Sequence, residues 1–276
     1  LYSGQTLRAR VSADEGNADD GYCQLYIQIY GEGDTPVEVD GPETVLAPGR
    51  DHTFTWRVPD TGGLPIAGVG LALRSVERTE GRVYLDYVTW DGTPDVLLTY
   101  PEAGGAPAVV GGMWRRAWVN AVDQYQGWRE EPYRLVHNEG IGLLIQGTRE
   151  WRDYRVTADV TPHMVKAAGL AARVQGMRRY YALLLCRDEA DAPRMVRLVK
   201  ALDGITVLGE ATFPWDFDET YVLSLEVVGP HVRAWLNEEL QFEVEDADFP
   251  LLGGAVALVC EEGRTATQAV RVQPAV

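Results

Sequence analysis

The 276-residue sequence lacks the motifs of the common enzyme classes. It has no Gly-x-Ser-x-Gly nucleophile motif, no Walker loop for phosphate and no dinucleotide-binding glycine motif after a strand. Its histidines do not have the spacing of a zinc site, because all four are isolated: His52, His137, His163 and His231. An active site in this chain would therefore have to be of an unusual kind.

Basic residues, cysteines and long apolar runs are also scarce. The 25 Lys and Arg against 41 Asp and Glu give a formal net charge of −16, which argues against nucleic acid or an anionic membrane as the main partner. No apolar run reaches the ~18 residues of a spanning helix, and we expect no signal peptide. Three cysteines without a C-x-x-C pair (Cys23, Cys186 and Cys260) favour reduced structural thiols and a cytoplasmic location.

Short β-strand signals, separated by Gly, Pro and Asp turns, fill the sequence instead. The first block has five such runs, at 6–11, 22–30, 52–58, 66–76 and 82–90. The second block has eleven, at 143–146, 154–160, 168–175, 180–187, 195–202, 206–213, 221–228, 231–236, 240–244, 255–260 and 268–272. The pattern predicts an all-β chain with two β-sandwich (jelly-roll) domains in tandem, residues 1–98 and 99–276.

Two segments leave the organisation of the chain partly open. Residues 100–107 are rich in Gly and Pro, which is typical of a linker, and residues 113–128 could form one short helix or an extended cover segment. The chain starts at Leu1 in a strand-like run without an initiator Met, and we interpret it as part of a longer protein.

Aromatic residues are the side chains of this sequence that most clearly suggest ligand binding. Eight Trp and 13 Tyr against five Phe are typical of surfaces that stack on flat rings and also form hydrogen bonds, as sugar- and nucleoside-binding surfaces do. Strand alternation predicts one polar, concave face that carries the candidate ligand-binding residues Arg173, Gln175, Tyr181 and Arg187. The alternative is that most of these rings belong to the core.

Acidic residues suggest three weaker candidates. Glu243 and Glu245 share one face of a strand, as the two carboxylates of a sandwich glycosidase would, although a solvated face explains them equally well. The acidic loop 14–21 could hold calcium or form a solvated turn. Asp86 lies inside an apolar strand, either as a structural metal ligand or as a hydrogen-bonded side chain of the sandwich.

Both blocks resemble known sandwich families. Residues 81–90, preceded by 46–49 and 66–71, resemble the second half of galactose-binding-like jelly rolls, which implies a domain that lacks strands at its N-terminal side. The resemblance also implies a structural calcium ion, because Asp86 matches an acid that helps to hold calcium in many of these modules. The second block resembles a laminin-G or concanavalin-like jelly roll at 151–154, 169–173, 180–183, 221–225, 232–236 and 253–258.

The whole chain is similar to the C-terminal region of bacterial proteins in the ADP-ribosylglycohydrolase family, on residues 138–151 and 259–264. The family's catalytic domain is helical and holds two magnesium ions, and none of its motifs occurs here. The resemblance therefore implies an accessory region with no catalytic residue of its own and with the hydrolase domain upstream.

Together these features favour a non-catalytic binding region for a carbohydrate, an ADP-ribose-type ligand or a glycosylated partner. The alternatives are a concanavalin-like glycoside hydrolase that uses paired carboxylates, and a purely structural or dimerisation region.

Overall fold

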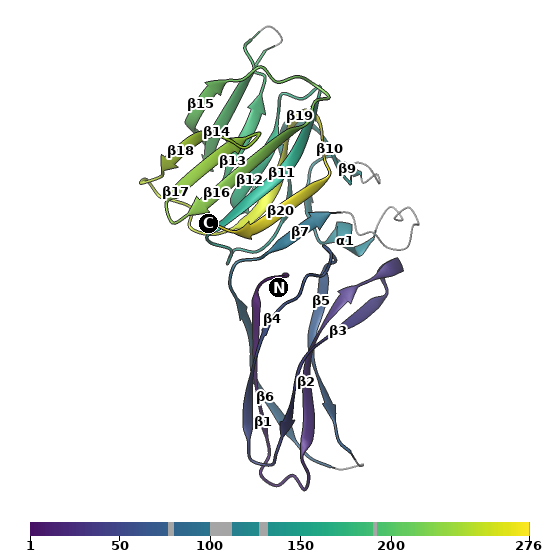
Figure 1. Cartoon of the computed structure of the whole chain (residues 1–276). Helices are drawn as coiled ribbons and strands as arrows, with labels where there is room; N and C mark the ends of the chain where they lie inside the picture. The colour runs from purple at the N-terminus through teal and green to yellow at the C-terminus, as the bar shows by residue number, and fades with distance from the viewer. Residues whose placement is uncertain (77–79, 100–111, 127–131, 190–191, 276) are drawn as a thin grey trace. The chain divides into compact units, whose positions relative to one another are not determined.

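The computed structural model describes residues 1–76, 80–99, 112–126, 132–189 and 192–275, and strands dominate them (Figure 1). The chain divides into two compact units, Leu1–Gly92 and Thr93–Val276. The predicted fold class, all-β with two β-sandwiches, is confirmed. No described helix is long and apolar enough to span a membrane.

The division between the units lies at Gly92, earlier than the boundary expected at residue 98. Strand β7 (Val96–Thr99) belongs to the second unit because it pairs with β20 (Ala269–Pro274), where Val96 faces Val272. The linker expected at 100–107 lies outside the described residues. The segment from residue 113 combines both predicted forms, a one-turn helix α1 (Met113–Arg116) and the short strands β8 (Val119–Ala121) and β9 (Gln124–Gln126).

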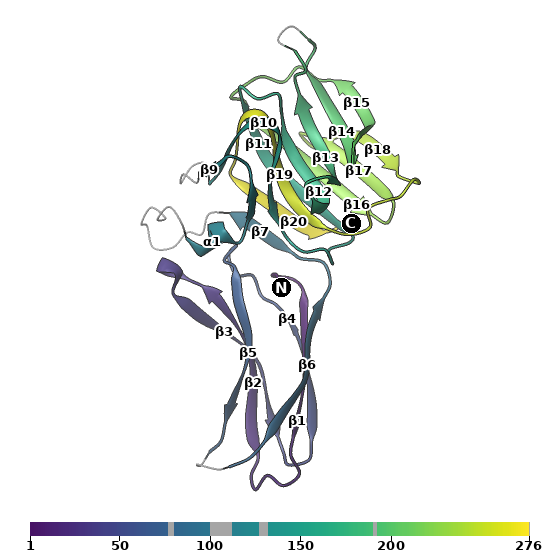
Figure 2. The ribbon, with the colours of Figure 1, turned by 180° about the vertical axis from the view of Figure 1, so that it is seen from behind.

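The first unit is a sandwich of two antiparallel three-stranded sheets (Figures 1 and 2). One sheet has the order β4 (Asp51–Arg57), β1 (Thr6–Ala13), β6 (Val83–Asp91), and the other has the order β3 (Pro36–Leu46), β2 (Gly21–Tyr30), β5 (Ile66–Arg74). A 3₁₀ turn, Glu32–Asp34, precedes β3. The alternating residues of the two central strands form the core, and each is fully buried: Leu7, Ala9, Val11, Cys23, Leu25 and Ile27.

The second unit is one long antiparallel sheet that folds into two layers. The first layer has the order β15 (Ile205–Thr212), β14 (Met195–Leu202), β13 (Arg179–Cys186), β12 (Ala167–Gly176), β19 (Ala255–Thr267), β10 (Tyr133–Gln146). The second has the order β18 (Glu239–Glu245), β17 (His231–Leu236), β16 (Tyr221–Val228), β11 (Tyr154–His163), β20, β7. Strand β19 joins the layers, because its first half pairs with β12 and its second half with β11.

Small side chains gather on one face of the first layer's central strands. The ladder pairs Ala171 with Ala182 and with Ala257, while the alternate pair Leu170 and Leu183 points to the other face, toward the second layer. A Cβ at Gly169 would lie 2.0 Å from the carbonyl oxygen of Leu183, so only glycine fits there. These small residues hollow the outer face of the sheet.

Replacing Gly169 with Ala should push β12 away from β13, since the added Cβ meets backbone rather than a movable side chain. We expect the free energy of unfolding to fall by about 2 kcal/mol, measured by urea denaturation followed by circular dichroism. Gly176→Ala in the same strand is the matched control, because nothing lies within 4 Å of its Cβ position. Equal stability of the two variants would contradict this account of the hollowed face.

Candidate functional site

The structure does not bring the four predicted ligand-binding residues to one surface. Arg173 and Tyr181 are fully buried, Gln175 is exposed, and Arg187 is half-buried. Gln175 donates to the carbonyl oxygen of Gly253 at 2.8 Å, and the Arg187 guanidinium lies over the ring of Phe217. The single polar face expected from alternation is therefore not formed.

Arg173 lies at a break in the strand ladder. Its backbone has φ 51°, and the register of β12 shifts there against both neighbouring strands. The side chain turns into the protein and donates to the carbonyl oxygens of Arg152 at 3.1 and 3.2 Å and of Leu251 at 2.5 Å. Burial lowers the pKa of this guanidinium, yet arginine stays charged. Arg173 thus clamps loop segments that are distant in sequence.

Tyr181 points between the two layers rather than to the outer face, because the ladder pairs it with Ala172. Its hydroxyl donates to the Asp246 carboxylate at 2.5 Å and accepts from the backbone N–H of Leu251 at 2.9 Å. Burial, and next the hydrogen bond to Asp246, raise the pKa of this phenol above its usual value. A buried ion pair between Lys200 and Asp246, at 2.7 Å, completes the network.

The adjacent residue, Tyr180, points to the hollowed face. There the first layer forms a partly open hollow of about 280 Å³, which we call the central hollow. Its wall is mostly apolar, and charged side chains complete it: Ile141, Lys166, Ala167, Tyr180, Leu184, Cys186, Asp188, Arg197, Val199, Ile205, Val207 and Glu261. Concave, mostly apolar sites with a few polar groups are typical of small-molecule binding. The central hollow is therefore the candidate site.

Four charged groups of the central hollow form two ordered ion pairs. Asp188 accepts two parallel hydrogen bonds from Arg197, both 2.6 Å long, and Arg197 also donates to Glu210. Lys166 lies 2.6 Å from Glu261. The Arg197 bonds lower the pKa of Asp188, and the Glu261 hydrogen bond raises that of Lys166. Both shifts favour the charged forms of Asp188 and Lys166, and charge-assisted hydrogen bonds of this kind are stronger than neutral ones.

Two uncharged titratable groups belong to the wall of the hollow. Burial, and next the charge of Glu261, raise the pKa of Tyr180. Burial raises the pKa of Cys186 to about 12, so its thiol is protonated at neutral pH and is not a nucleophile. Cys23, Cys186 and Cys260 are all free and buried. Cys186 is therefore a structural thiol of the wall of the hollow.

Sequence reasoning missed most of the central hollow. The sequence predicted Tyr181 as a ligand-binding residue, and not its neighbour Tyr180. The charged residues of the hollow lie on separate strands or loops and carry no local motif: Lys166, Asp188, Arg197 and Glu261. The signal that could have found the site is the run of Ala and Gly at alternate positions of residues 167–171, which marks the face with little side-chain volume.

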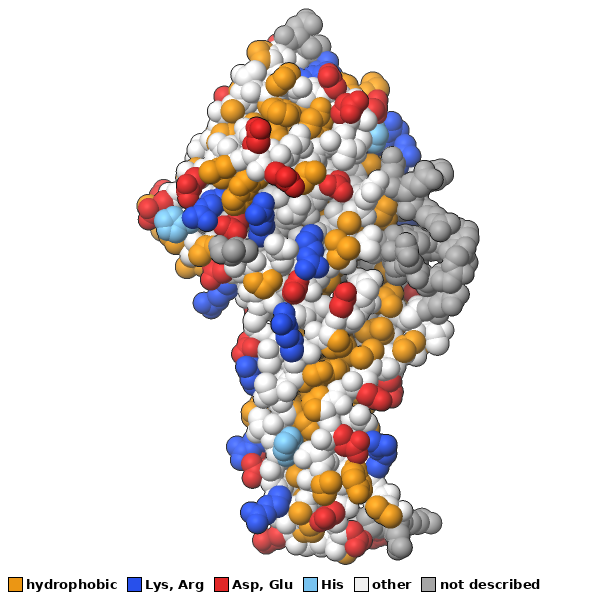
Figure 3. Space-filling model, viewed as in Figure 1, with side chains coloured by type: hydrophobic (Ala, Val, Ile, Leu, Met, Phe, Trp, Pro, Cys, Tyr) orange, Lys and Arg blue, Asp and Glu red, His pale blue; other side chains and the backbone are white. Residues whose placement is uncertain are grey.

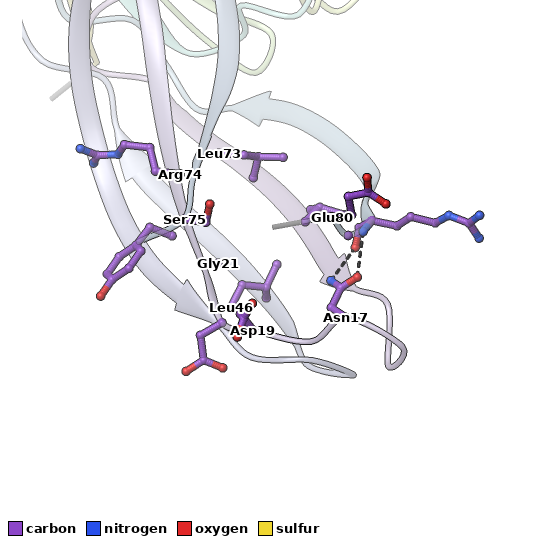
Figure 4. A pocket seen from close by; sticks show the side chains of 13 residues that line it. Asn17, Asp19, Gly21, Leu46, Leu73, Arg74, Ser75 and Glu80 are labelled. Carbon is purple, nitrogen blue, oxygen red and sulfur yellow. Dashed lines mark hydrogen bonds between the residues drawn. The ribbon is translucent and has the colours of Figure 1, made fainter. Parts of the chain in front are cut away.

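A smaller hollow, of about 160 Å³, lies in the first unit (Figure 4). Asn17 makes the two hydrogen bonds drawn there, both to the backbone of Arg82, at 2.8 and 2.9 Å. Next to it, Asp14 accepts from the N–H of Gly16 and the hydroxyl of Tyr84, which lowers its pKa. The first part of the acidic loop, residues 14–17, is thus held by hydrogen bonds of its own and by bonds to Arg82 and Tyr84.

Asp86 sits at a bulge of β6, where the Arg10 side chain lies 3.4 Å from its carboxylate. Arg10 also binds Asp51 at 3.1 Å, so a guanidinium stands between the two carboxylates. Among the described residues, no group of three or more His, Cys, Asp or Glu side chains could hold a metal ion. Asp86 as a calcium ligand stays a prediction from the resemblance.

The candidate glycosidase carboxylates lie on an exposed face. Glu243 binds Arg233 at 2.8 Å, and Glu245 faces His231 across the ladder. The alternate residue Val244 faces the buried Val232, so both acids point away from the core. Neither belongs to the wall of the central hollow.

Charge on the molecular surface is mixed. On the side drawn in Figure 3, red and blue side chains are interspersed, without a continuous blue area. This agrees with the net charge of −16 and offers no footprint for a nucleic-acid backbone on that side.

No family model matches the chain, and no curated protein matches it. Solved structures do resemble it. A carbohydrate-binding module, CBM66, from Bacillus subtilis is 18% identical with a TM-score of 0.49, over 57% of this chain and 95% of the module. A B. subtilis protein of unknown function with a galectin-like fold is 17% identical with a TM-score of 0.48, over 62% and 97%. The metal-free Emp46p carbohydrate recognition domain is 10% identical with a TM-score of 0.45, over 58% and 89%.

The clamp at Arg173 can be tested by its removal. Arg173→Met leaves several carbonyl groups without their donor, so we expect a loss of about 3 kcal/mol or more in the free energy of unfolding. Gln175→Met, two residues away and exposed, should change it by less than about 0.5 kcal/mol. Urea denaturation of both variants measures the difference, and an Arg173→Met protein as stable as the parent would refute the structural role.

Proposed function

We propose that this chain is a non-catalytic binding region that takes an uncharged carbohydrate ring into the central hollow. One observation carries the proposal: an aromatic ring and aliphatic side chains form the floor of a cavity of about 280 Å³, and two ordered ion pairs lie in its wall. A sugar ring is likewise divided into an apolar and a polar part, with C–H groups on its faces and hydroxyls at its edge.

The chemistry of binding follows from the wall of the hollow. The C–H face of a sugar would pack on Tyr180, Leu184 and Val199, and apolar contact there removes water from both surfaces. The hydroxyls would bond to the groups already held in place. Each carboxylate oxygen of Asp188 keeps a free lone pair, and the Arg197 guanidinium has more N–H donors than its bonds to Asp188 and Glu210 use.

Charge decides between the two ligand classes expected from the sequence. Lys166 lies within 3.5 Å of both Glu261 and Glu262, and Arg197 binds both Asp188 and Glu210. Of these groups only Lys166, Glu261, Arg197 and Asp188 line the hollow, so its two cations are each matched by a carboxylate. A pyrophosphate would find no unpaired cation there, so we favour a neutral carbohydrate over an ADP-ribose-type ligand.

The affinity of such a site is modest. A hexose has about twelve heavy atoms, and at roughly −0.3 kcal/mol per atom the binding free energy is about −4 kcal/mol, which is a Kd on the order of 1 mM. An accessory region gains from weak sites when it is joined to another binding or catalytic unit.

The partner of this region is proposed from the sequence resemblance. On that basis, the region would hold a hydrolase of the ADP-ribosylglycohydrolase family close to glycosylated material. The proposal assigns no catalytic residue to this chain.

The proposal can be tested with a substitution that fills the hollow and lies outside the core. Val207 is 51% exposed and lines the hollow from the edge strand β15, so Val207→Arg should fold and fill the cavity. We expect ligand-observed NMR with a panel of neutral mono- and oligosaccharides to show binding to the parent chain, and at least about tenfold weaker binding to this variant.

Thr206→Arg is the matched control, because the neighbouring position alternates to the other face of the same strand. It should bind like the parent. ADP-ribose should not compete. If no neutral saccharide binds the parent, or if Val207→Arg binds as well as Thr206→Arg, the proposal is wrong.

A further inference from the structure

The sandwich of the first unit is open along one edge. Among the described residues, β5 pairs only with β2, and β6 pairs only with β1, so both strands have a free side (Figure 2). Strands β3 and β4 at the opposite edge also pair with one strand each, and side-chain burial distinguishes the two edges. A free strand edge presents backbone N–H and C=O groups to which another strand can bond.

Inward-pointing apolar side chains stay uncovered at this edge. Leu85 faces Val11 across the ladder and Trp90 faces Leu7, and both β1 partners are fully buried. Leu85 is nevertheless 52% exposed and Trp90 43%. At the other edge of the same sheet, Phe54 of β4 is only 1% exposed. The core is thus closed at β4 and open at β6.

We propose that a second copy of this chain covers the open edge, with the two β6 strands antiparallel across a two-fold axis. The axis would pass between Asp86 and Tyr87. The two three-stranded sheets would then form one continuous six-stranded sheet, and no free β6 edge would remain.

The bulge in β6 permits this register. The ladder shows that Val83 and Leu85 point inward before the bulge, and that Val88 and Trp90 point inward after it. Around the proposed axis, Leu85 faces the second copy's Val88, and Val83 faces its Trp90. Without the bulge, these residues would lie on opposite faces of the sheet and could not meet.

Charge complementarity favours a second copy as the occupant. In the same register, Arg82 lies opposite the second copy's Asp91, and the symmetry repeats this pair at the other end of the interface. On the outer face, Tyr84 meets Thr89, and Asp86 meets Tyr87. The two Asp86 carboxylates flank the axis, and each lies 3.4 Å from Arg10 of its own copy. Asp91 also binds Arg8 of its own sheet at 2.5 Å, so Arg82 would add a second cation to this carboxylate at both ends of the interface.

Sedimentation equilibrium of the 276-residue chain, over about 1 to 100 µM, tests this interface. We expect a concentration-dependent mass that rises toward twice the 30.5 kDa of one chain. Leu85→Asp should weaken the association at least about tenfold, and Arg82→Asp should do the same by facing Asp91 with a like charge. Val45→Asp is the matched control, because Val45 is 54% exposed on the edge strand β3 of the other sheet.

Circular dichroism confirms that each variant is folded. A mass of 30.5 kDa over the whole range would overturn the proposal and leave the edge to another strand, of the same protein or of a different one. A dimer that neither Leu85→Asp nor Arg82→Asp weakens, or one that Val45→Asp weakens equally, would also overturn it, because the contact would then lie elsewhere.

Discussion

The central hollow of the second unit depends on which face of the central strands carries small side chains and which carries large ones. These strands are β12, β13 and β19. Ala171, Ala182 and Ala257 face one side of the sheet, while Leu170, Leu183 and Leu258 fill the space between the layers. The same alternation thus packs the core and hollows the outer face. At Gly169 the strands β12 and β13 approach too closely for any Cβ, so glycine is required on the hollowed face.

Buried polar groups hold the rest of that unit in place around this sheet. Arg173 binds carbonyl groups of the segments before β11 and before β19, and Tyr181 joins Asp246 to the backbone of Leu251. Breaking one partner of such a network leaves the others buried and unsatisfied, which makes it a rigid support. The ion pairs of the central hollow are formed by other residues of the same layer and are held by their own hydrogen bonds, as between Arg197 and Asp188.

Much of the fold could be predicted from the sequence, and little of the site. Runs of β-branched and aromatic residues between Gly, Pro and Asp turns mark the strands locally, so the all-β class followed from them. Locating the site required the hydrogen-bonding register of the strands, which the sequence alone does not show. Alternation alone placed Arg173 and Tyr181 on one outer face, but the left-handed backbone at Arg173 interrupts the ladder, and Tyr180 points to the hollow instead. The division between the units at Gly92 could not be predicted from local sequence either, because it depends on the pairing of β7 with β20, which are far apart in sequence.

The most direct test of the central claim is a map of amide chemical-shift changes as a neutral saccharide that binds is added to the isotope-labelled chain. The account predicts changes that cluster on β13, β14 and β15 and at residues 166, 188 and 261, around the central hollow. Changes confined to the first-unit hollow, at residues 17, 19–22, 46, 73–75 and 80–83, or spread over both units without a cluster, would contradict it.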